Sequence, residues 1–272
     1  MAEVRAMVLT GYGLNCDYET AYTFKLAGAI ASRVHINSLI DDTVRLDNFQ
    51  ILVFIGGFSW GDDHGAGVIQ ALRLKTRIGD QLLEFVARGN LVLGICNGFQ
   101  CLVNLGLLPG INDNYRQRSV ALAVNDCGKF RDQWVTLKIN PASSCIFTRG
   151  IKTAELPVRH GEGKFFSDDA TLENLKKNNQ IVMQYAMPGG EIAAGRFPFN
   201  PNGSLADIAG ICDASGRVFG LMPHPEAFNH RTNHPDWTRR KEAAKRRGAS
   251  EPDGPTVGVK IFQNAVDFMR TG

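Results

Sequence analysis

Short apolar runs alternate with longer amphipathic stretches along the first half of the chain. The apolar runs that read as strands lie at 4–10, 34–37, 51–57 and 91–95. They lack strict polar–apolar alternation, which favours strands covered on both faces. Helical spacing appears at 18–31, where Tyr22, Leu26 and Ile30 recur at i, i+4 and i+8, and at 66–89. This order predicts an α/β fold, a mostly parallel open sheet with helices on both faces.

The second half of the chain has a different, strand-rich pattern. Residues 119–140 predict a β-hairpin with its turn at 126–129. Two more strands are expected at 206–213 and 217–224, followed by a final helix at about 259–269 that should pack back onto the sheet. We find no internal repeat and no low-complexity linker, so we expect one domain over 1–272.

Composition narrows the class of protein. The 44% hydrophobic and 21% charged residues are typical of a water-soluble globular chain, and a formal net charge of +3 gives no argument for a nucleic-acid or membrane partner. The cysteines form no C-x-x-C pair, which favours a reducing compartment and argues against structural zinc. Without a signal-like segment or a membrane-length apolar run, the expected location is the cytoplasm.

The stretch GICNGFQ at 94–100 sets a cysteine between two glycines where a strand gives way to a helix. Gly-x-Cys-x-Gly in that setting is the cysteine form of the nucleophile elbow. Cys96 would sit at a helix N-terminus, where free N–H groups favour a negatively charged sulfur, and the N–H of Asn97 would face a substrate oxyanion. From these residues alone, a buried structural cysteine in a core turn is an equally good interpretation.

A nucleophilic cysteine needs a base, and the best-placed histidine lies in PHPE at 223–226. The prolines on either side of His224 resist continuation of a strand or a helix. Residues i and i+2 of an extended segment face the same way, so Glu226 can accept the Nδ1–H of His224 and leave Nε2 for sulfur. The His-x-Glu pattern of zinc deaminases is excluded because no cysteine follows Cys212.

These motifs together resemble the class I (triad) glutamine amidotransferases. Four further stretches narrow the resemblance to the glutaminase subunits of phosphoribosylformylglycinamidine synthase. They are NCDYETAYTFKLAGA at 15–29, GGFSWGDDHGAG at 56–67, RHGEGKF at 159–165 and NPNGSLADIAGICDASGRVFGLMPHPE at 200–226. The chain departs from the short form of that family at about 227–256, a basic insertion before the last helix.

The resemblance implies a flavodoxin-like class I amidotransferase fold and assigns roles to matching positions. Cys96 would be the nucleophile, His224 the general acid and base, and Glu226 its orienter. Gly57 and Asn97 would supply the N–H groups of the oxyanion hole. The residues expected along the glutamine pocket are Gln100, His160, Gly161 and Glu162. For His160, a satisfied polar residue at a strand end is the competing interpretation.

The resemblance also implies an activity and partners. The chain would hydrolyse L-glutamine to glutamate and ammonia through a Cys96 thioester. The ammonia would pass to a synthetase subunit that converts formylglycinamide ribonucleotide and ATP to the amidine in purine biosynthesis, with a small bridging subunit as a further partner. No metal or organic cofactor is expected in this chain, with ATP and magnesium on the synthetase.

Three alternatives stand beside this interpretation: the glutaminase subunit of another amidotransferase, a cysteine hydrolase on the same scaffold, and a non-catalytic binding module. The intact set of Cys96, His224 and Glu226 counts against the last. The cluster of Lys and Arg at 231–247 is most often a solvated helix, and it is the sole feature that suggests nucleic acid.

Overall fold

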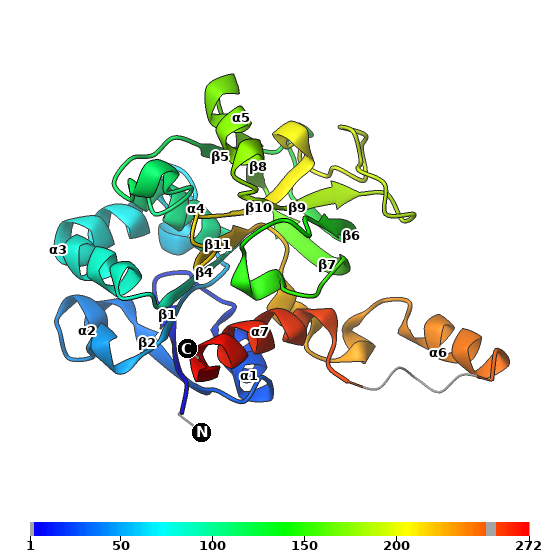
Figure 1. The fold of residues 1–272 in the computed structure, drawn as a ribbon, viewed down its shortest axis with the longest axis horizontal. Helices are drawn as coiled ribbons and strands as arrows, with labels where there is room; N and C mark the ends of the chain where they lie inside the picture. The colour runs from blue at the N-terminus through cyan, green and yellow to red at the C-terminus, as the bar shows by residue number, and fades with distance from the viewer. Residues whose placement is uncertain (1–2, 249–253, 272) are drawn as a thin grey trace.

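A large mixed sheet and a small second sheet organise the chain (Figure 1). The computed structural model describes residues 3–248 and 254–271. In spatial order the nine strands of the large sheet are β2 (Ile30–His35), β1 (Arg5–Thr10), β3 (Ile51–Phe54), β4 (Leu91–Ile95), β11 (Val218–Leu221), β10 (Ile208–Cys212), β9 (Ile181–Ala186), β6 (Arg131–Ile139) and β7 (Thr153–His160). The small sheet pairs β5 (Ala121–Val124) with β8 (Glu162–Phe166).

The sheet divides into a parallel half and an antiparallel half. Strands β2, β1, β3, β4 and β11 run parallel to their neighbours, whereas β11, β10, β9, β6 and β7 pair antiparallel. Every residue of β3, β4 and β11 is buried, as expected for strands covered on both faces. The predicted α/β class is confirmed.

Helices cover both faces of the parallel half. Figure 1 shows α3 and α4 on one side of the sheet and α1 with α7 on the other. Phe24 of α1 meets Phe262 of α7 edge to face at 4.7 Å, so the last helix packs back against the body as predicted. The helices are α1 (Asp17–Leu26), α2 (Ile36–Ile40), α3 (Val68–Ala87), α4 (Asn97–Leu105), α5 (Asp169–Lys177), α6 (Trp237–Arg246) and α7 (Val257–Thr271).

The first helix is shorter than predicted and buries a different face. It ends at Leu26, because Gly28 has φ +86° and turns the chain into β2, which starts four residues before the predicted 34. The expected stripe is exposed: Tyr22 at 52% and Leu26 at 47%. The buried residues are Phe24, Ala21 and two threonines, of which Thr20 bonds back to the carbonyl of Cys16. The apolar residues spaced at i, i+4 and i+8 therefore do not mark the buried face of α1.

The hairpin predicted at 119–140 is wrong. Its turn exists, with Gly128 at φ +61°. However, β5 pairs with β8 in the small sheet, whereas β6 pairs with β7 and β9 in the large one. Alternate residues of β6, including Val135 and Leu137, are buried in the core, while β5 is half-buried or exposed. β6 therefore pairs with strands distant in sequence, in the sheet that buries its alternate residues.

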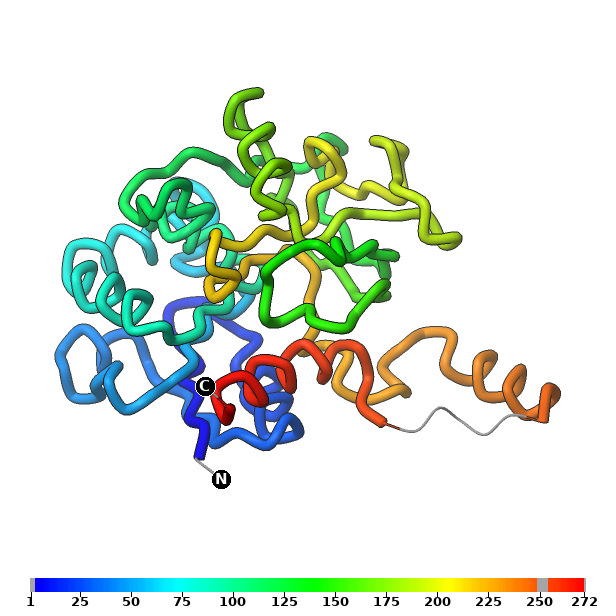
Figure 2. The backbone as a smooth tube through the Cα atoms, viewed as in Figure 1, coloured from blue at the N-terminus to red at the C-terminus, as the bar shows by residue number. Residues whose placement is uncertain are grey.

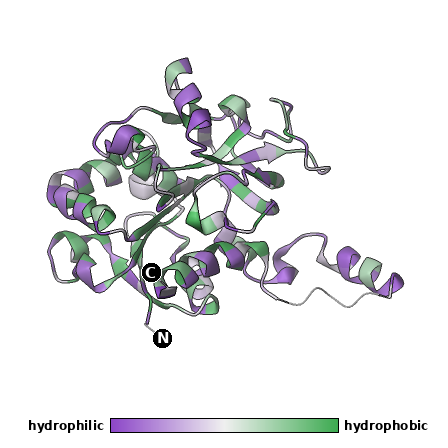
Figure 3. Ribbon diagram, viewed as in Figure 1, coloured by the Kyte–Doolittle hydropathy of each residue, from purple (hydrophilic) through white to green (hydrophobic). Residues whose placement is uncertain are grey.

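The basic insertion leaves the body of the molecule as an arm. The tube in Figure 2 follows it away from the body after the turn η6 (Pro225–Phe228), through η7 (Arg231–Asn233), to α6. The helix predicted there is present, but none of its residues is buried, and Figure 3 shows it mostly hydrophilic. Across the part of the chain that the structure describes, no helix is long and apolar enough to cross a membrane.

Candidate active site

Cys96 sits on a strained turn between β4 and α4. Its backbone has φ +52° and ψ −109°, a region that residues with a side chain rarely adopt. A Cβ at Gly94 would lie 2.5 Å from Leu102 Cδ1, and one at Gly98 would overlap the carbonyl group of Phe54. The glycines on both sides are therefore required by close packing, which is the geometry of a nucleophile elbow.

A methyl group at position 98 should show this crowding directly. We expect Gly98→Ala to lower the free energy of unfolding by about 1–3 kcal/mol or more, because the overlap is with backbone of β3 that cannot move aside. Gly79→Ala is the matched control: a Cβ at Gly79 in α3 meets nothing within 4 Å. That change should stabilise by about 0.5–1 kcal/mol. Urea unfolding of both variants measures the difference, and equal stability would contradict a crowded turn.

His224 and Glu226 form a buried pair directly after β11. Nδ1 of His224 lies 2.6 Å from Oε1 of Glu226, and the side chains are only 3% and 1% exposed. The backbone N–H of His224 donates to the carbonyl of Pro157. Nε2 of the ring has no hydrogen-bond partner among the described residues. The expected i, i+2 contact is thus present, with the second ring nitrogen left free.

The charges around His224 set its protonation. Burial lowers the pKa of the ring, but the negative charge of Glu226, and after it that of an ionised Cys96, outweigh burial and raise the pKa well above its ordinary value. The ring is therefore protonated more readily than a free imidazole, which makes it a suitable proton donor in the same buried site as the sulfur of Cys96.

Two helices hold the turn that carries Glu226. The hydroxyl of Thr23 in α1, which donates to the carbonyl of Glu19 at 2.7 Å, also lies 3.5 Å from the carbonyl of Glu226, and Asn229 Nδ2 donates to that carbonyl at 3.0 Å. The start of α7 closes over η6 so tightly that a Cβ at Gly258 would clash with the carbonyls of Pro225 and of Phe228, one turn apart. The His–Glu pair is therefore rigidly supported.

The loop after β3 brings two glycines to this pair. A Cβ at Gly56 would lie 2.7 Å from Cε1 of His224. Gly57 has φ +139°, and a Cβ there would lie 2.7–2.9 Å from the backbone of residues 13–15. Only glycine fits both the backbone conformation and the close approach at this position. Gly57, a predicted oxyanion-hole residue, thus follows directly after Gly56, which lies against the ring of His224.

The predicted pocket residues on α4 and β8 are tied to one another. Asn97 is fully buried, and its Nδ2 donates to Asp62 Oδ1 at 2.9 Å. Gln100 Nε2 donates to the carbonyl of Glu162 at 3.1 Å, and the Glu162 carboxylate accepts from the backbone N–H of Ala66 at 3.1 Å. This network joins the N-terminus of α4 to the loop before α3 and to β8.

His160, at the end of β7, is buried and neutral. Its Nδ1 lies 3.1 Å from Oδ1 of Asn125, and Asn125 also bonds the carbonyls of His160 and Gly161. Burial, and after it the charge of His224, lower the pKa of His160 to about 3. Its Nε2 lacks a partner within the described residues. Sulfur of Cys96 contacts the preceding carbonyl, that of Arg159, at 3.7 Å, which places the strand end beside the nucleophile.

Sequence reasoning missed three residues of this site. Asp62 bonds Asn97, Asn125 bonds His160, and Cys16 Sγ lies 4.0 Å from Nδ1 of His224. Burial raises the pKa of the Cys16 thiol to about 11, so it is protonated at neutral pH. Asp62 and Cys16 lie inside motifs that carry the family resemblance, but nothing in the sequence pairs either of them with a side chain of the catalytic centre.

Cys16, His224 and Glu226 also resemble a set of metal ligands. One ligand atom from each lies within 4.8 Å of the other two. Thiolate, imidazole and carboxylate suit zinc chemically. A metal there would take the same Nδ1 that bonds Glu226, so metal binding and the His–Glu pair exclude each other.

The pKa of Asp62 gives the site a measurable pH signature. Burial, and after it the charge of Glu162, raise this pKa to about 6. A carboxyl whose pKa is raised by folding binds more protons in the folded state, so its contribution to stability falls as pH rises from about 4 to 6. Asn at position 62 keeps the acceptor for Asn97 and removes this titration. We expect the stability of Asp62→Asn relative to the parent to increase over that range.

Urea unfolding of the two proteins at intervals of pH tests this expectation. A difference in stability that is constant between pH 4 and 6 would show that Asp62 titrates as an ordinary exposed carboxyl. Asp63→Asn is the control, since Asp63 is exposed next to it in sequence and its substitution should leave the pH dependence unchanged.

Comparison with known proteins adds independent findings. The model of the CobB/CobQ-like glutamine amidotransferase domain matches residues 3–269. The chain is 45% identical over 265 residues to "Phosphoribosylformylglycinamidine synthase subunit PurQ" of Methanococcus maripaludis, covering 97% of each chain. It is 43% identical over 271 residues to the protein of the same name from Dehalococcoides mccartyi, covering 99% of each.

Solved structures agree with these sequence matches. A chain of the PurLQS structure from Thermotoga maritima matches with a TM-score of 0.72 and 27% identity, covering 98% of this chain and 100% of that one. A glutamine amidotransferase from the same organism matches with a TM-score of 0.57 at 13% identity, which shows a shared fold alone.

Proposed function

The chain belongs to the CobB/CobQ-like glutamine amidotransferase family, and from this premise we infer that it is the glutaminase subunit of a phosphoribosylformylglycinamidine synthase in purine biosynthesis. Its reaction is hydrolysis of the side-chain amide of glutamine. It works with a synthetase subunit, and the PurLQS match supports a third, small subunit in the assembly. The observation that supports the chemistry best is the buried His224–Glu226 pair in one site with the strained turn of Cys96.

The first half of the reaction forms a thioester. The sulfur of Cys96 attacks the amide carbon of glutamine, a C–S bond forms, and the carbonyl electrons move onto oxygen. Backbone N–H groups of Gly57 and Asn97 stabilise that oxyanion. Protonated His224 donates from Nε2 to the amide nitrogen, the C–N bond breaks, and ammonia leaves. Glu226 holds the ring in the orientation that points Nε2 at sulfur and substrate.

The second half restores the enzyme. His224 takes a proton from water, the water oxygen attacks the thioester carbon, and the C–S bond breaks to release glutamate and the Cys96 sulfur. These steps use side chains, backbone groups and water, so we assign ATP and magnesium to the synthetase. Ammonia is protonated in bulk water and is then no longer a nucleophile. Direct passage to the partner subunit therefore protects the product.

The proposed function is tested by mixing the chain with the synthetase and small subunits of a relative's synthase, glutamine, ATP and formylglycinamide ribonucleotide. Glutamine should yield glutamate and the amidine in equal amounts, and asparagine should yield neither. Release of ammonia from unrelated amides without the partner would instead indicate a cysteine hydrolase on the same scaffold.

A further inference from the structure

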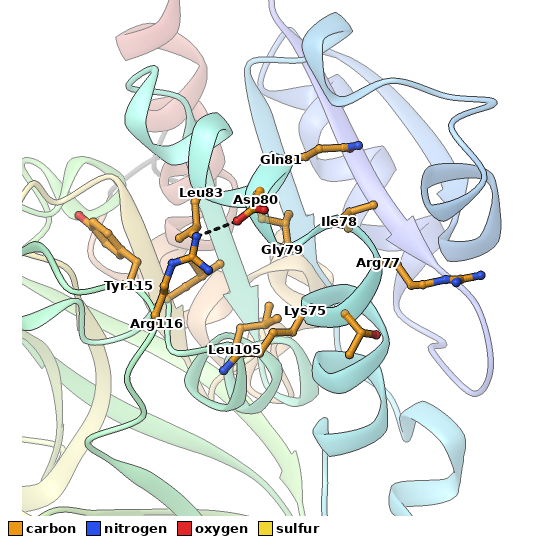
Figure 4. A pocket seen from close by; sticks show the side chains of 13 residues that line it. Lys75, Arg77, Ile78, Gly79, Asp80, Gln81, Leu83, Leu105, Tyr115 and Arg116 are labelled. Atoms are coloured by element: carbon orange, nitrogen blue, oxygen red, sulfur yellow. Dashed lines mark hydrogen bonds and ion pairs between the residues drawn. The ribbon is translucent and has the colours of Figure 1, made fainter.

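Two of the hollows that lie away from the candidate active site are lined by several cations. One, of about 370 Å³, lies between α3 and the segment at 115–116 (Figure 4). The Arg116 guanidinium inside it is already paired with Asp80 at 2.7 Å. The other, of about 900 Å³, lies between the arm and the edge formed by β6 and β7. Its volume is within the range of small-molecule sites. We call it the arm groove.

Among the described residues, guanidinium groups line the arm groove in excess over carboxylates. Arg231, Arg240 and Arg247 line it, and Glu155 is the one acidic residue among its described lining residues. Glu155 is shared by Arg240 and His234. The Arg231 guanidinium donates to a backbone carbonyl, which leaves its charge uncompensated, and Arg247 forms no ion pair with any described residue. Such an excess of positive charge favours an anion.

The groove also offers an aromatic surface and hydroxyl groups. Trp237, at the start of α6, lines it and is 39% exposed. Thr136 and Thr153 contribute hydroxyls from β6 and β7 on the facing wall. A planar ring can stack on an indole, and phosphate oxygens accept from guanidinium groups in bidentate fashion. Both features are found together in nucleotide sites.

An ion pair between Arg240 of α6 and Glu155 of β7 ties the arm to the body. Helix α6 has ten residues and none of them is buried. A helix of that length without tertiary packing is marginal in water. An anion bound between Arg231, beside η7, and Arg247, at the end of α6, would cross-link the two ends of the arm. The floor of the groove includes Phe228, which ends the turn that carries Glu226.

We propose that the arm groove binds a nucleoside diphosphate, with the phosphates on Arg231 and Arg247 and the base against Trp237. This inference concerns binding and does not rest on the proposed function. An acidic segment of a protein partner is the competing occupant, and it would use the same charges without needing the indole.

Titration calorimetry on the full chain tests the proposal with three probes: ADP, inorganic pyrophosphate and adenosine. ADP should bind most tightly, pyrophosphate more weakly and adenosine weakest. Arg231→Gln/Arg247→Gln should weaken both ADP and pyrophosphate at least about tenfold, since a hydrogen bond to a charged group is worth about 1.5–3 kcal/mol. Trp237→Ala should weaken ADP and leave pyrophosphate unchanged.

The same helix provides the control. Arg239→Gln/Lys245→Gln removes the same charge from residues that do not line the groove, so ADP should bind as in the parent. Circular dichroism and glutaminase activity confirm that each variant is folded. Equal weakening by both double variants, or no binding of ADP and pyrophosphate at millimolar concentration, overturns the proposal. If Arg231→Gln/Arg247→Gln no longer binds the synthetase subunit but binds ADP as the parent does, the occupant of the groove is an acidic protein surface and the proposal is overturned.

Discussion

A Cys96→Ser variant is expected to lose glutamine-dependent activity by a factor of about 10⁴ or more while remaining folded. The hydroxyl fits the buried turn, because oxygen is smaller than sulfur and the strained backbone at Cys96 already carries a side chain. It cannot replace the sulfur, because a serine hydroxyl is far less acidic than a thiol and forms no useful nucleophile here. Glutamate release from labelled glutamine is the measurement.

The assembled synthase should separate loss of the nucleophile from loss of the complex. With Cys96→Ser, added ammonia should still support amidine formation, because the synthetase site is on another chain. Cys101→Ala is the control: Cys101 is also buried in α4 but contacts only core, so its loss should affect stability and not the chemistry. Near-normal use of glutamine by Cys96→Ser would show that another group attacks the amide.

Short sequence spacings predicted the catalytic residues well, because the contacts of these residues depend on positions only two residues away. The elbow needs glycines two residues either side of Cys96, and the pair needs Glu226 two residues after His224; both contacts are present. Strands β1, β3 and β4, read from apolar runs, also matched, whereas β2 starts four residues before its predicted position. For the elbow and the His–Glu pair, the partner lies within a few residues, where backbone geometry dictates direction.

Non-local contacts escaped prediction for the complementary reason. Asp62 meets Asn97 across 35 positions and Cys16 meets His224 across 208, and no spacing rule connects such residues. The prediction of a hairpin at 119–140 failed for the same reason. A turn signal near Gly128 indicates where the chain reverses, and not which strand β5 pairs with. Burial in the assembled sheet, rather than the turn, decides the partner.

Replacing His224 and Glu226 should separate proton transfer from orientation. We expect His224→Ala to lower kcat by at least about 10²–10⁴-fold, the usual contribution of a general acid and base. Glu226→Gln should cost less, since the amide oxygen of Gln can still accept from Nδ1 at the 2.6 Å position of Oε1 and keep the ring oriented. Equal and complete loss from a folded Glu226→Gln protein would contradict the orienting role.

The pH profile of Glu226→Gln tests the electrostatic part of the same assignment. In the parent, the charge of Glu226 is the largest influence that raises the pKa of His224 above its ordinary value. Gln removes that charge, so the pKa of the ring falls. If protonated His224 donates to the leaving nitrogen, activity declines as pH rises through this pKa. The alkaline limb of kcat/KM should therefore move to lower pH in the variant.

A second His–Glu pair supplies the control for this shift. Glu155 lies 3.6 Å from His234 on the arm side of the sheet, outside the catalytic site. Glu155→Gln removes the same charge and should leave the pH profile of the parent unchanged. An unshifted alkaline limb in Glu226→Gln would mean that the protonation of His224 does not limit turnover. A shift of the same size in Glu155→Gln would mean that net charge, and not contact with the ring, moves the limb.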